Sequence, residues 1–179
     1  MAAEKEIVIQ KIRDVPDFPK KGILFKDITP VLADAAAFSA AVDWFAAVIE
    51  KAGSCDLIAG IESRGFIFGA AIAQKLQKGL ILVRKPGKLP SNTHKIEYEL
   101  EYGIDTLEIH TDAVHQGQKV AIVDDLLATG GTAAAAFKLL ELCGAHVTSV
   151  SFLIELAFLN GRDALVENKA RNIQSLIEY

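Results

Sequence analysis

The stretch VAIVDDLLATGGT, from Val120 to Thr132, determines how the rest of the sequence is interpreted. It begins with apolar residues typical of a buried strand, continues through two adjacent aspartates, and ends in a glycine-containing turn before an alanine-rich segment. Neighbouring side chains inside a regular strand point to opposite faces. Asp124 and Asp125 can therefore both face one crevice only if the strand is ending there, and the glycines that follow lead us to expect that it is.

Other apolar runs in the chain are also followed by helical segments. We expect strands at 57–61, 80–84, 120–125 and 147–155, and helices at about 65–77 and 131–143. The runs are continuous rather than alternating, which is typical of a parallel sheet covered on both faces. This order of elements predicts an α/β fold, with a central, mostly parallel sheet flanked by helices and joined by right-handed crossovers.

The N-terminal part of the sequence predicts two helices. A short amphipathic helix is expected at 4–14, and a longer one at 35–51 with Asp34 as its N-cap and Gly53 after its end. The segment at 21–34 is expected to be irregular or briefly extended.

A flap is predicted at about 85–110, where a basic, turn-rich stretch precedes the alternating sequence IEYELEYGIDTLEIH. Further on, NGRDAL at 160–165 is expected to form a capped turn after the last core strand. No repeat or composition change indicates a second domain, so residues 1–179 are predicted to form a single domain.

Composition limits the classes of function. The chain has 179 residues, of which 51% are hydrophobic and 23% charged, and its formal net charge is -4. This acidic balance argues against nucleic-acid binding, which needs a basic face, but local basic clusters could still bind a small anion. Cys55 and Cys143 have no metal-ligand spacing and fit a reducing compartment. With no signal-peptide pattern and no apolar run long enough for a bilayer, we expect a cytoplasmic protein without membrane contact.

The opening stretch offers a site for a sugar followed by a site for a phosphate. Open α/β sheets bind ligands beyond the carboxyl ends of their strands. Asp124 and Asp125 could accept hydrogen bonds from vicinal hydroxyls or hold a hard cation. The residues at 128–132 supply successive backbone amides at a helix N-terminus, which suits one phosphate group.

Competing interpretations of this stretch are weaker. Two acids alone would indicate a solvated strand end, and two glycines alone a tight turn, but their combination after a buried strand favours a ligand site. The sequence contains no GxxxxGK(S/T), and no GxGxxG follows a strand, which argues against P-loop NTPases and dinucleotide dehydrogenases.

This strand, acid pair, loop and helix resemble the phosphoribosyl diphosphate signature of the type I phosphoribosyltransferases. PDFPKKGILFKDITPVL, AGIESRGFIFG, VRKPGKLP and YELEYGIDTLEIH resemble further blocks of the branch of this family that acts on adenine. The resemblance implies the type I phosphoribosyltransferase fold, with a flexible β-hairpin flap and a small N-terminal hood. It also implies transfer of a phosphoribosyl group from 5-phosphoribosyl 1-diphosphate to adenine, giving AMP and diphosphate.

The resemblance further implies Mg²⁺, bound mainly through the substrate diphosphate and ribose hydroxyls, with no separate protein metal site. A homodimer is implied because relatives complete the diphosphate site across the subunit boundary. Two alternatives stay open: a phosphoribosyltransferase for a 6-oxopurine, and a non-catalytic regulator that binds phosphoribosyl diphosphate. The ILFKD stretch and the flap argue against the first, and the basic cluster RKPGK argues against the second.

Individual residues receive roles from the same resemblance. Asp124 and Asp125 would bind the ribose hydroxyls, and the 5′-phosphate would be held by Ala128, Thr129, Gly130, Gly131 and Thr132. The diphosphate would be bound by Arg64, Arg84, Lys85 and Lys88. In relatives a cis peptide bond falls at the position of Glu62–Ser63.

The base and the flap complete the implied site. Phe25 would stack on adenine while the main chain at Leu24 and Lys26 reads its edge, although composition alone would place Phe25 in a core. Relatives often carry arginine at the position of Lys26, a difference of little consequence if the backbone does the reading. Glu101 and Tyr102 would close over the reacting centre, where a carboxylate can stabilise an oxocarbenium-like transition state.

Overall fold

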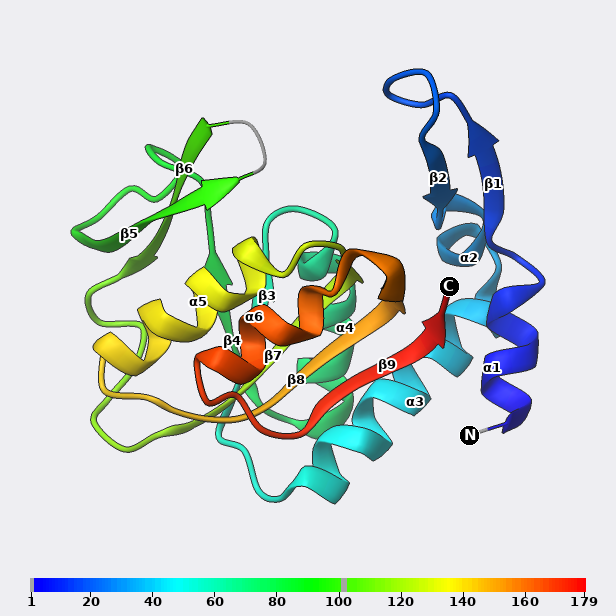
Figure 1. The fold of residues 1–179 in the computed structure, drawn as a ribbon. Coiled ribbons are helices and arrows are strands. Elements are labelled where there is room, and N and C mark those ends of the chain that lie inside the picture. The colour runs from blue at the N-terminus through cyan, green and yellow to red at the C-terminus, as the bar shows by residue number, and fades with distance from the viewer. Residues whose placement is uncertain (1, 101–102) are drawn as a thin grey trace. The chain divides into compact units, whose positions relative to one another are not determined.

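The computed structural model describes residues 2–100 and 103–179 and divides into two compact units, Met1–Phe45 and Ala46–Tyr179 (Figure 1). The first unit contains α1 (Ala2–Ile9), β1 (Arg13–Pro16), β2 (Leu24–Asp27), α2 (Thr29–Ala33) and the beginning of α3 (Ala35–Ala52). Asp34 accepts hydrogen bonds from the amides of Ala36 and Ala37 at 3.1 and 3.0 Å, so the predicted N-cap is confirmed.

The N-terminal helix is shorter than expected, because residues after Ile9 enter an antiparallel pair of strands instead. In this pair Val15 lies opposite Phe25. Cross-strand ion pairs stabilise the register: Arg13 Nε donates to Asp27 at 3.0 Å, and Lys26 Nζ to Asp14 at 2.7 Å. The expectation of a helix reaching residue 14 was therefore wrong, and the extension at 21–34 is a defined strand followed by α2.

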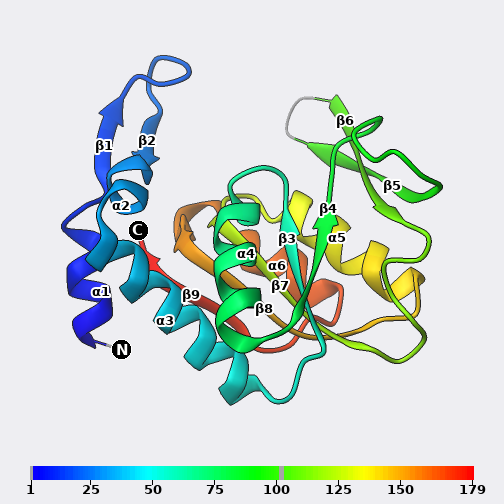
Figure 2. The same ribbon diagram turned by 180° about the vertical axis from the view of Figure 1, so that it is seen from behind.

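The second unit is built on a parallel sheet of five strands in the order β4-β3-β7-β8-β9. Its elements are β3 (Leu57–Ile61), α4 (Gly65–Leu76), β4 (Gly79–Val83), β7 (Lys119–Leu127), α5 (Gly131–Leu142), β8 (His146–Glu155), a 3-10 turn η1 (Ala157–Leu159), α6 (Gly161–Glu167) and β9 (Ile173–Glu178). Helix α4 covers one face, and α5 and α6 cover the other (Figures 1 and 2). The predicted α/β class is confirmed.

The C-terminal part of this unit differs from the prediction. NGRDAL is the beginning of α6 rather than a turn, and β8 is followed by another core strand, β9. Strand β9 adds Leu176 and Ile177 to the core, at 5% and 0% exposure.

The predicted flap is a hairpin of β5 (Thr93–Leu100) and β6 (Gly103–His110). Its base is part of the core rather than a projection, because Leu107 and Ile109 are fully buried. Both strands contact α5, and a backbone bridge between Arg84 and Glu108 ties β6 to the end of β4. No helix in the described part of the chain is both long and apolar enough to cross a membrane.

Candidate functional site

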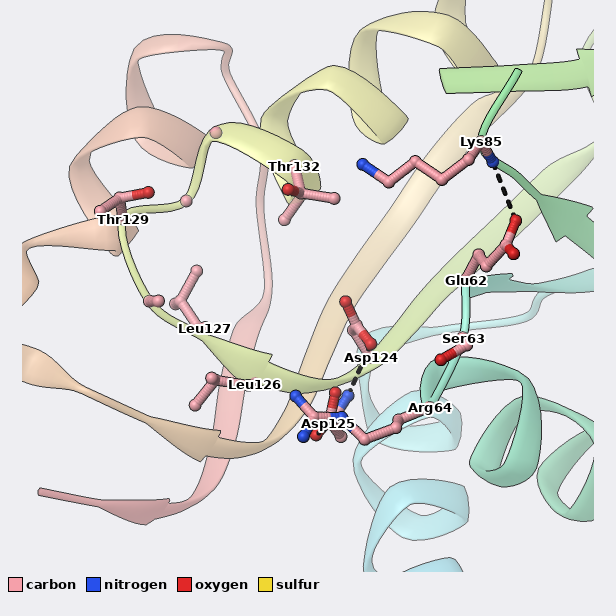
Figure 3. A pocket seen from close by; sticks show the side chains of 14 residues that line it. Glu62, Ser63, Arg64, Lys85, Asp124, Asp125, Leu126, Leu127, Thr129 and Thr132 are labelled. Carbon is pink, nitrogen blue, oxygen red and sulfur yellow. Dashed lines mark hydrogen bonds and ion pairs between the residues drawn. The ribbon is translucent and has the colours of Figure 1, made fainter. Parts of the chain in front are cut away.

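A cavity of about 520 Å³ opens where the carboxyl ends of β3 and β7 meet the start of α5 (Figure 3). This is the position at which an open parallel sheet is expected to bind a ligand. The lining residues are Glu62, Ser63, Arg64, Lys85 and the continuous stretch Asp124–Ala133. Most of the cavity wall therefore comes from the single stretch with which the sequence analysis began.

The two aspartates line this cavity, but for a different reason than predicted. Strand β7 does not end at Asp125; it continues to Leu127. The side chains therefore alternate, so that Asp124 points towards Lys85 and Thr132 while Asp125 lies against Arg64 (Figure 3). The expectation that both carboxylates share an orientation because the strand is ending was wrong.

Hydrogen bonds fix both carboxylates. The amide of Asp125 donates to Asp124 Oδ1 at 2.8 Å, and Arg64 Nε lies 2.8 Å from Asp125 Oδ2. Gly65 is required beside them, because a Cβ on Gly65 would lie 2.8 Å from Asp124 Oδ1 and 2.9 Å from the Val123 carbonyl oxygen.

The surroundings of both aspartates disfavour their ionised forms. Burial and the neighbouring Asp125 carboxylate raise the pKa of Asp124 well above its ordinary value. Burial also raises the pKa of Asp125, although the Arg64 guanidinium opposes the effect. Hydroxyl donors of a sugar, or a cation, would stabilise the ionised carboxylates at this position.

The loop between β7 and α5 forms an anion site from backbone groups. Gly130 has a left-handed φ of 84°, and no side chain caps the helix that starts at Gly131. The first bond of α5 runs from the amide of Ala134 to the Gly130 carbonyl at 2.8 Å, which leaves the preceding amides without partners inside the helix. Such amides and the helix dipole favour a phosphate group.

Helix α6 buttresses this loop, which the sequence analysis did not anticipate. A Cβ on Gly130 would lie 2.1 Å from the Gly161 carbonyl oxygen, and a Cβ on Gly161 would lie 2.1 Å from the Ala128 carbonyl oxygen. Only glycine permits this approach of the two backbones. The Asn-Gly pair at 160–161 was the one sequence signal that could have indicated a special backbone position here.

An ion pair between the exposed side of α6 and a buried carboxylate fixes this helix in turn. Arg162 Nε donates to Glu155 Oε1 at 3.0 Å, its Nη2 pairs with Glu155 Oε2, and its Nη1 donates to the Ile173 carbonyl at 2.9 Å. Ser175 Oγ donates to Glu155 at 2.6 Å. Burial would raise the pKa of Glu155, but the hydrogen bonds from Arg162 and Ser175 outweigh it and lower the pKa. These contacts hold α6 to the end of β8 and to β9, and α6 in turn packs against the phosphate loop.

The predicted diphosphate residues are divided between two positions. Arg64 and Lys85 line the cavity, whereas Arg84 and Lys88 do not. Arg84 Nε lies 3.2 Å from Glu62 Oε2, and its Nη1 donates to the Lys88 carbonyl at 2.9 Å. The Glu62–Ser63 peptide bond is cis, as the family resemblance implies.

The remaining predicted residues belong to the first unit or fall outside the described residues. Leu24, Phe25 and Lys26 belong to the first unit, where Phe25 packs edge to face on Phe18 with ring centroids 5.1 Å apart. Glu101 and Tyr102 lie outside the described residues. In residues 2–100 and 103–179, no cluster of three or more His, Cys, Asp or Glu side chains could hold a metal ion.

Comparison with known proteins agrees with this geometry. Residues 29–175 match the phosphoribosyl transferase domain. An adenine phosphoribosyltransferase of Geotalea uraniireducens is 57% identical over 169 residues, which are 94% of this chain and 96% of the relative. The crystal structure of adenine phosphoribosyltransferase from Thermoanaerobacter pseudethanolicus is 55% identical, with a TM-score of 0.92 over 98% of this chain and 99% of the other.

A second solved structure carries ligands. Adenine phosphoribosyltransferase from Saccharomyces cerevisiae, complexed with D-2,5-dideoxy-2,5-imino-altritol 1,6-bisphosphate and adenine, is 40% identical. Its TM-score is 0.93, and the match covers 98% of this chain and 99% of the yeast chain.

Proposed function

The chain belongs to the adenine phosphoribosyltransferases, and from this membership we propose that it makes AMP. It would transfer the 5-phosphoribosyl group of 5-phosphoribosyl 1-diphosphate to adenine and release diphosphate, a purine-salvage reaction of a pentosyltransferase. The observation that supports this most strongly is the cavity in which an acid pair and a backbone phosphate loop lie side by side.

We place the 5′-phosphate in the loop Ala128–Thr132. The amides at the start of α5, which have no partner inside the helix, would donate to phosphate oxygens, and the Thr129 and Thr132 hydroxyls would add donors. Because α6 fixes the loop, these donors are pre-organised before the substrate arrives, which lowers the entropic cost of binding.

We place the ribose against Asp124 and Asp125. Displacement at the anomeric carbon develops positive charge on the sugar ring, and two nearby carboxylates stabilise that charge. Hydrogen bonds from the ribose hydroxyls would also orient the ring for in-line attack by the base nitrogen.

The residues present also fit Mg²⁺, although they would not hold it alone. Two adjacent carboxylates are too few for a complete shell, so most oxygen ligands would come from the substrate and water. When bound, the ion would neutralise charge on the diphosphate leaving group. Arg64 and Lys85, both on the cavity wall, would bind the departing diphosphate oxygens.

Adenine binding and site closure rest on the family resemblance. Phe25 would stack on the purine, and the main chain at Leu24 and Lys26 would read its edge. Glu101 and Tyr102 would close over the site and exclude water, which otherwise competes with adenine as the nucleophile. Glu101 would accept or steer the ring proton that adenine loses.

We further propose a homodimer that is located in the cytoplasm. Edge strand β4 exposes Leu80 and Leu82, each at 37%, and the adjacent helix α4 exposes Ile67 at 41%, which supports a protein contact on this side. Both cysteines are free thiols, which fits a reducing compartment. Light scattering of the wild type and of Leu82→Glu tests the dimer, since a monomeric wild type would contradict it.

The direct test is to mix the protein with magnesium, phosphoribosyl diphosphate and adenine, and to follow AMP and diphosphate. Competition among adenine, hypoxanthine, guanine and xanthine separates the proposed activity from that of a 6-oxopurine enzyme. Binding of phosphoribosyl diphosphate without turnover of any base would instead indicate a regulator. The double variant Asp124→Asn, Asp125→Asn is the inactive control.

A further inference from the structure

Lys85, whose side chain lines the cavity, already has a carboxylate partner. Its Nζ donates to the Tyr98 hydroxyl at 2.9 Å and forms an ion pair with Asp105 Oδ2. Tyr98 and Asp105 lie directly opposite each other in the β5–β6 hairpin, so both partners come from the flap. The sequence analysis assigned no role to either residue.

The same contacts connect the flap to the phosphate loop. The Tyr98 hydroxyl lies 3.2 Å from Thr132 Oγ1 and 3.3 Å from Asp105 Oδ2. Lys85 extends from the end of β4 across the cavity towards Thr132 (Figure 3). Its ammonium group is therefore held over the space that an anionic substrate would enter.

This ion pair is only partly shielded from solvent, with 35% of the Lys85 side chain and 27% of the Asp105 side chain exposed. Burial would lower the pKa of Lys85, but the hydrogen bonds to Asp105 and Tyr98 outweigh it and raise the pKa. Burial would raise the pKa of Asp105, and the bonds from Lys85 and the Thr106 amide reverse this. Both groups are charged at neutral pH, so Asp105 neutralises much of the charge that Lys85 could offer an incoming anion.

We propose that Asp105 is a competing counter-ion that tunes affinity for the diphosphate. It holds the Lys85 ammonium until the diphosphate group of the substrate displaces it, and it takes the ammonium back when diphosphate leaves. This inference rests on the proposed function. It predicts that Asp105 weakens substrate binding and favours product release. A residue that merely positioned Lys85 would instead strengthen substrate binding.

The test is the isosteric variant Asp105→Asn, which removes the charge and can still accept the 2.7 Å bond from the Thr106 amide. A partly exposed ion pair contributes about 0.2–1 kcal/mol, which converts to roughly 1.4- to fivefold in an equilibrium constant. We expect the KM for phosphoribosyl diphosphate, and the Kd for inorganic diphosphate with magnesium by calorimetry, to fall by this factor without an increase in kcat.

Two controls separate this effect from the general electrostatic effect of negative charges in the flap. Glu97→Gln removes an exposed carboxylate from the same hairpin and should leave KM and Kd unchanged. In a Lys85→Met background, Asp105→Asn should have no further effect, because the competition needs the ammonium. Asp105→Ala serves as a second variant if the asparagine variant is unstable.

Weaker or unchanged diphosphate binding in both Asp105 variants would overturn the inference. An equal gain in the Lys85→Met background would overturn it too, since it would assign the effect to general electrostatics. AMP formation by the wild type distinguishes failure of this inference from failure of the proposed function. An active wild type with unresponsive Asp105 variants refutes only the role of Asp105 as a counter-ion. A wild type that binds no diphosphate and makes no AMP refutes the proposed function together with it.

Discussion

Replacing Gly161 with alanine tests whether α6 holds the phosphate loop in its working position. The backbone at Gly161 is helical rather than left-handed, so alanine adds only a steric effect. Its Cβ would lie 2.1 Å from the Ala128 carbonyl oxygen and 2.9 Å from the Gly130 nitrogen. Ordinary van der Waals contact begins at 3.4 Å, so the loop and helix must separate by about 1.3 Å.

A displacement of this size should reduce activity sharply while the protein stays folded. Misplacing groups that bind the substrate by about 1 Å can cost roughly 100-fold in rate, or about 2.7 kcal/mol of transition-state stabilisation. Overpacking costs about 1–3 kcal/mol of folding free energy, which lowers Tm by roughly 2–12 °C in a protein of this size. The protein should therefore stay folded at room temperature while kcat/KM for phosphoribosyl diphosphate falls about 100-fold.

The assay is the initial rate of AMP formation at varied phosphoribosyl diphosphate, with thermal unfolding measured on the same samples. Gly79→Ala is the matched control, because its Cβ would meet only the Leu57 Cδ2 methyl, 2.7 Å away at the start of β4. That flexible methyl can move aside, so activity should stay near the wild-type value. A folded Gly161→Ala protein with unchanged kcat/KM would refute the proposed buttress.

Three further predictions follow from the site and its supports. Asp124→Asn should lower AMP formation by at least about 100-fold yet raise Tm at pH 7. The pKa of Asp124 is raised above its ordinary value of 3.8, so ionisation of this carboxyl destabilises the wild-type protein as the pH rises above 3.8. The gain in Tm should therefore vanish in calorimetry near pH 3.8. Near-normal turnover would contradict the ribose role. Arg162→Met should lower the free energy of unfolding by up to about 3 kcal/mol at pH 7, because it leaves the buried Glu155 carboxylate without its ion-pair partner. The 40% exposure of the Arg162 side chain keeps the loss below that of a fully buried pair. Because the pKa of Glu155 is lowered from 4.5, urea denaturation should show this loss shrinking as pH falls below 4.5, and a pH-independent loss would count against the ion pair. Removing magnesium with EDTA should abolish AMP formation until MgCl₂ is restored, and full activity in EDTA would exclude the proposed metal.

Strands were predicted best from the sequence where burial requires apolar residues. Strand β3 occupies the predicted 57–61, because a strand covered on both faces is continuously apolar. Strand β9 was missed because its sequence, IQSLIE, is partly polar and short. The β1–β2 hairpin was missed because its stability comes from cross-strand ion pairs such as Arg13–Asp27, which depend on register rather than composition.

For the site, local sequence predicted which residues meet but not how they are held. One cavity unites Asp124 and Asp125 with the Ala128–Thr132 loop, as expected from a single continuous motif. The contact of Gly161 with the loop and the pairing of Lys85 with Asp105 join segments distant in the sequence, and no local pattern encodes them. The predicted roles of Phe25, Glu101 and Tyr102 stay predictions.

The most direct test of the account is a crystal structure of the protein with AMP bound. It should show the 5′-phosphate accepting hydrogen bonds from the amides at the start of α5, and the ribose hydroxyls donating to Asp124 and Asp125. A nucleotide bound away from the β7–α5 loop, with the carboxylates still in their present contacts, would contradict the proposed function at its centre.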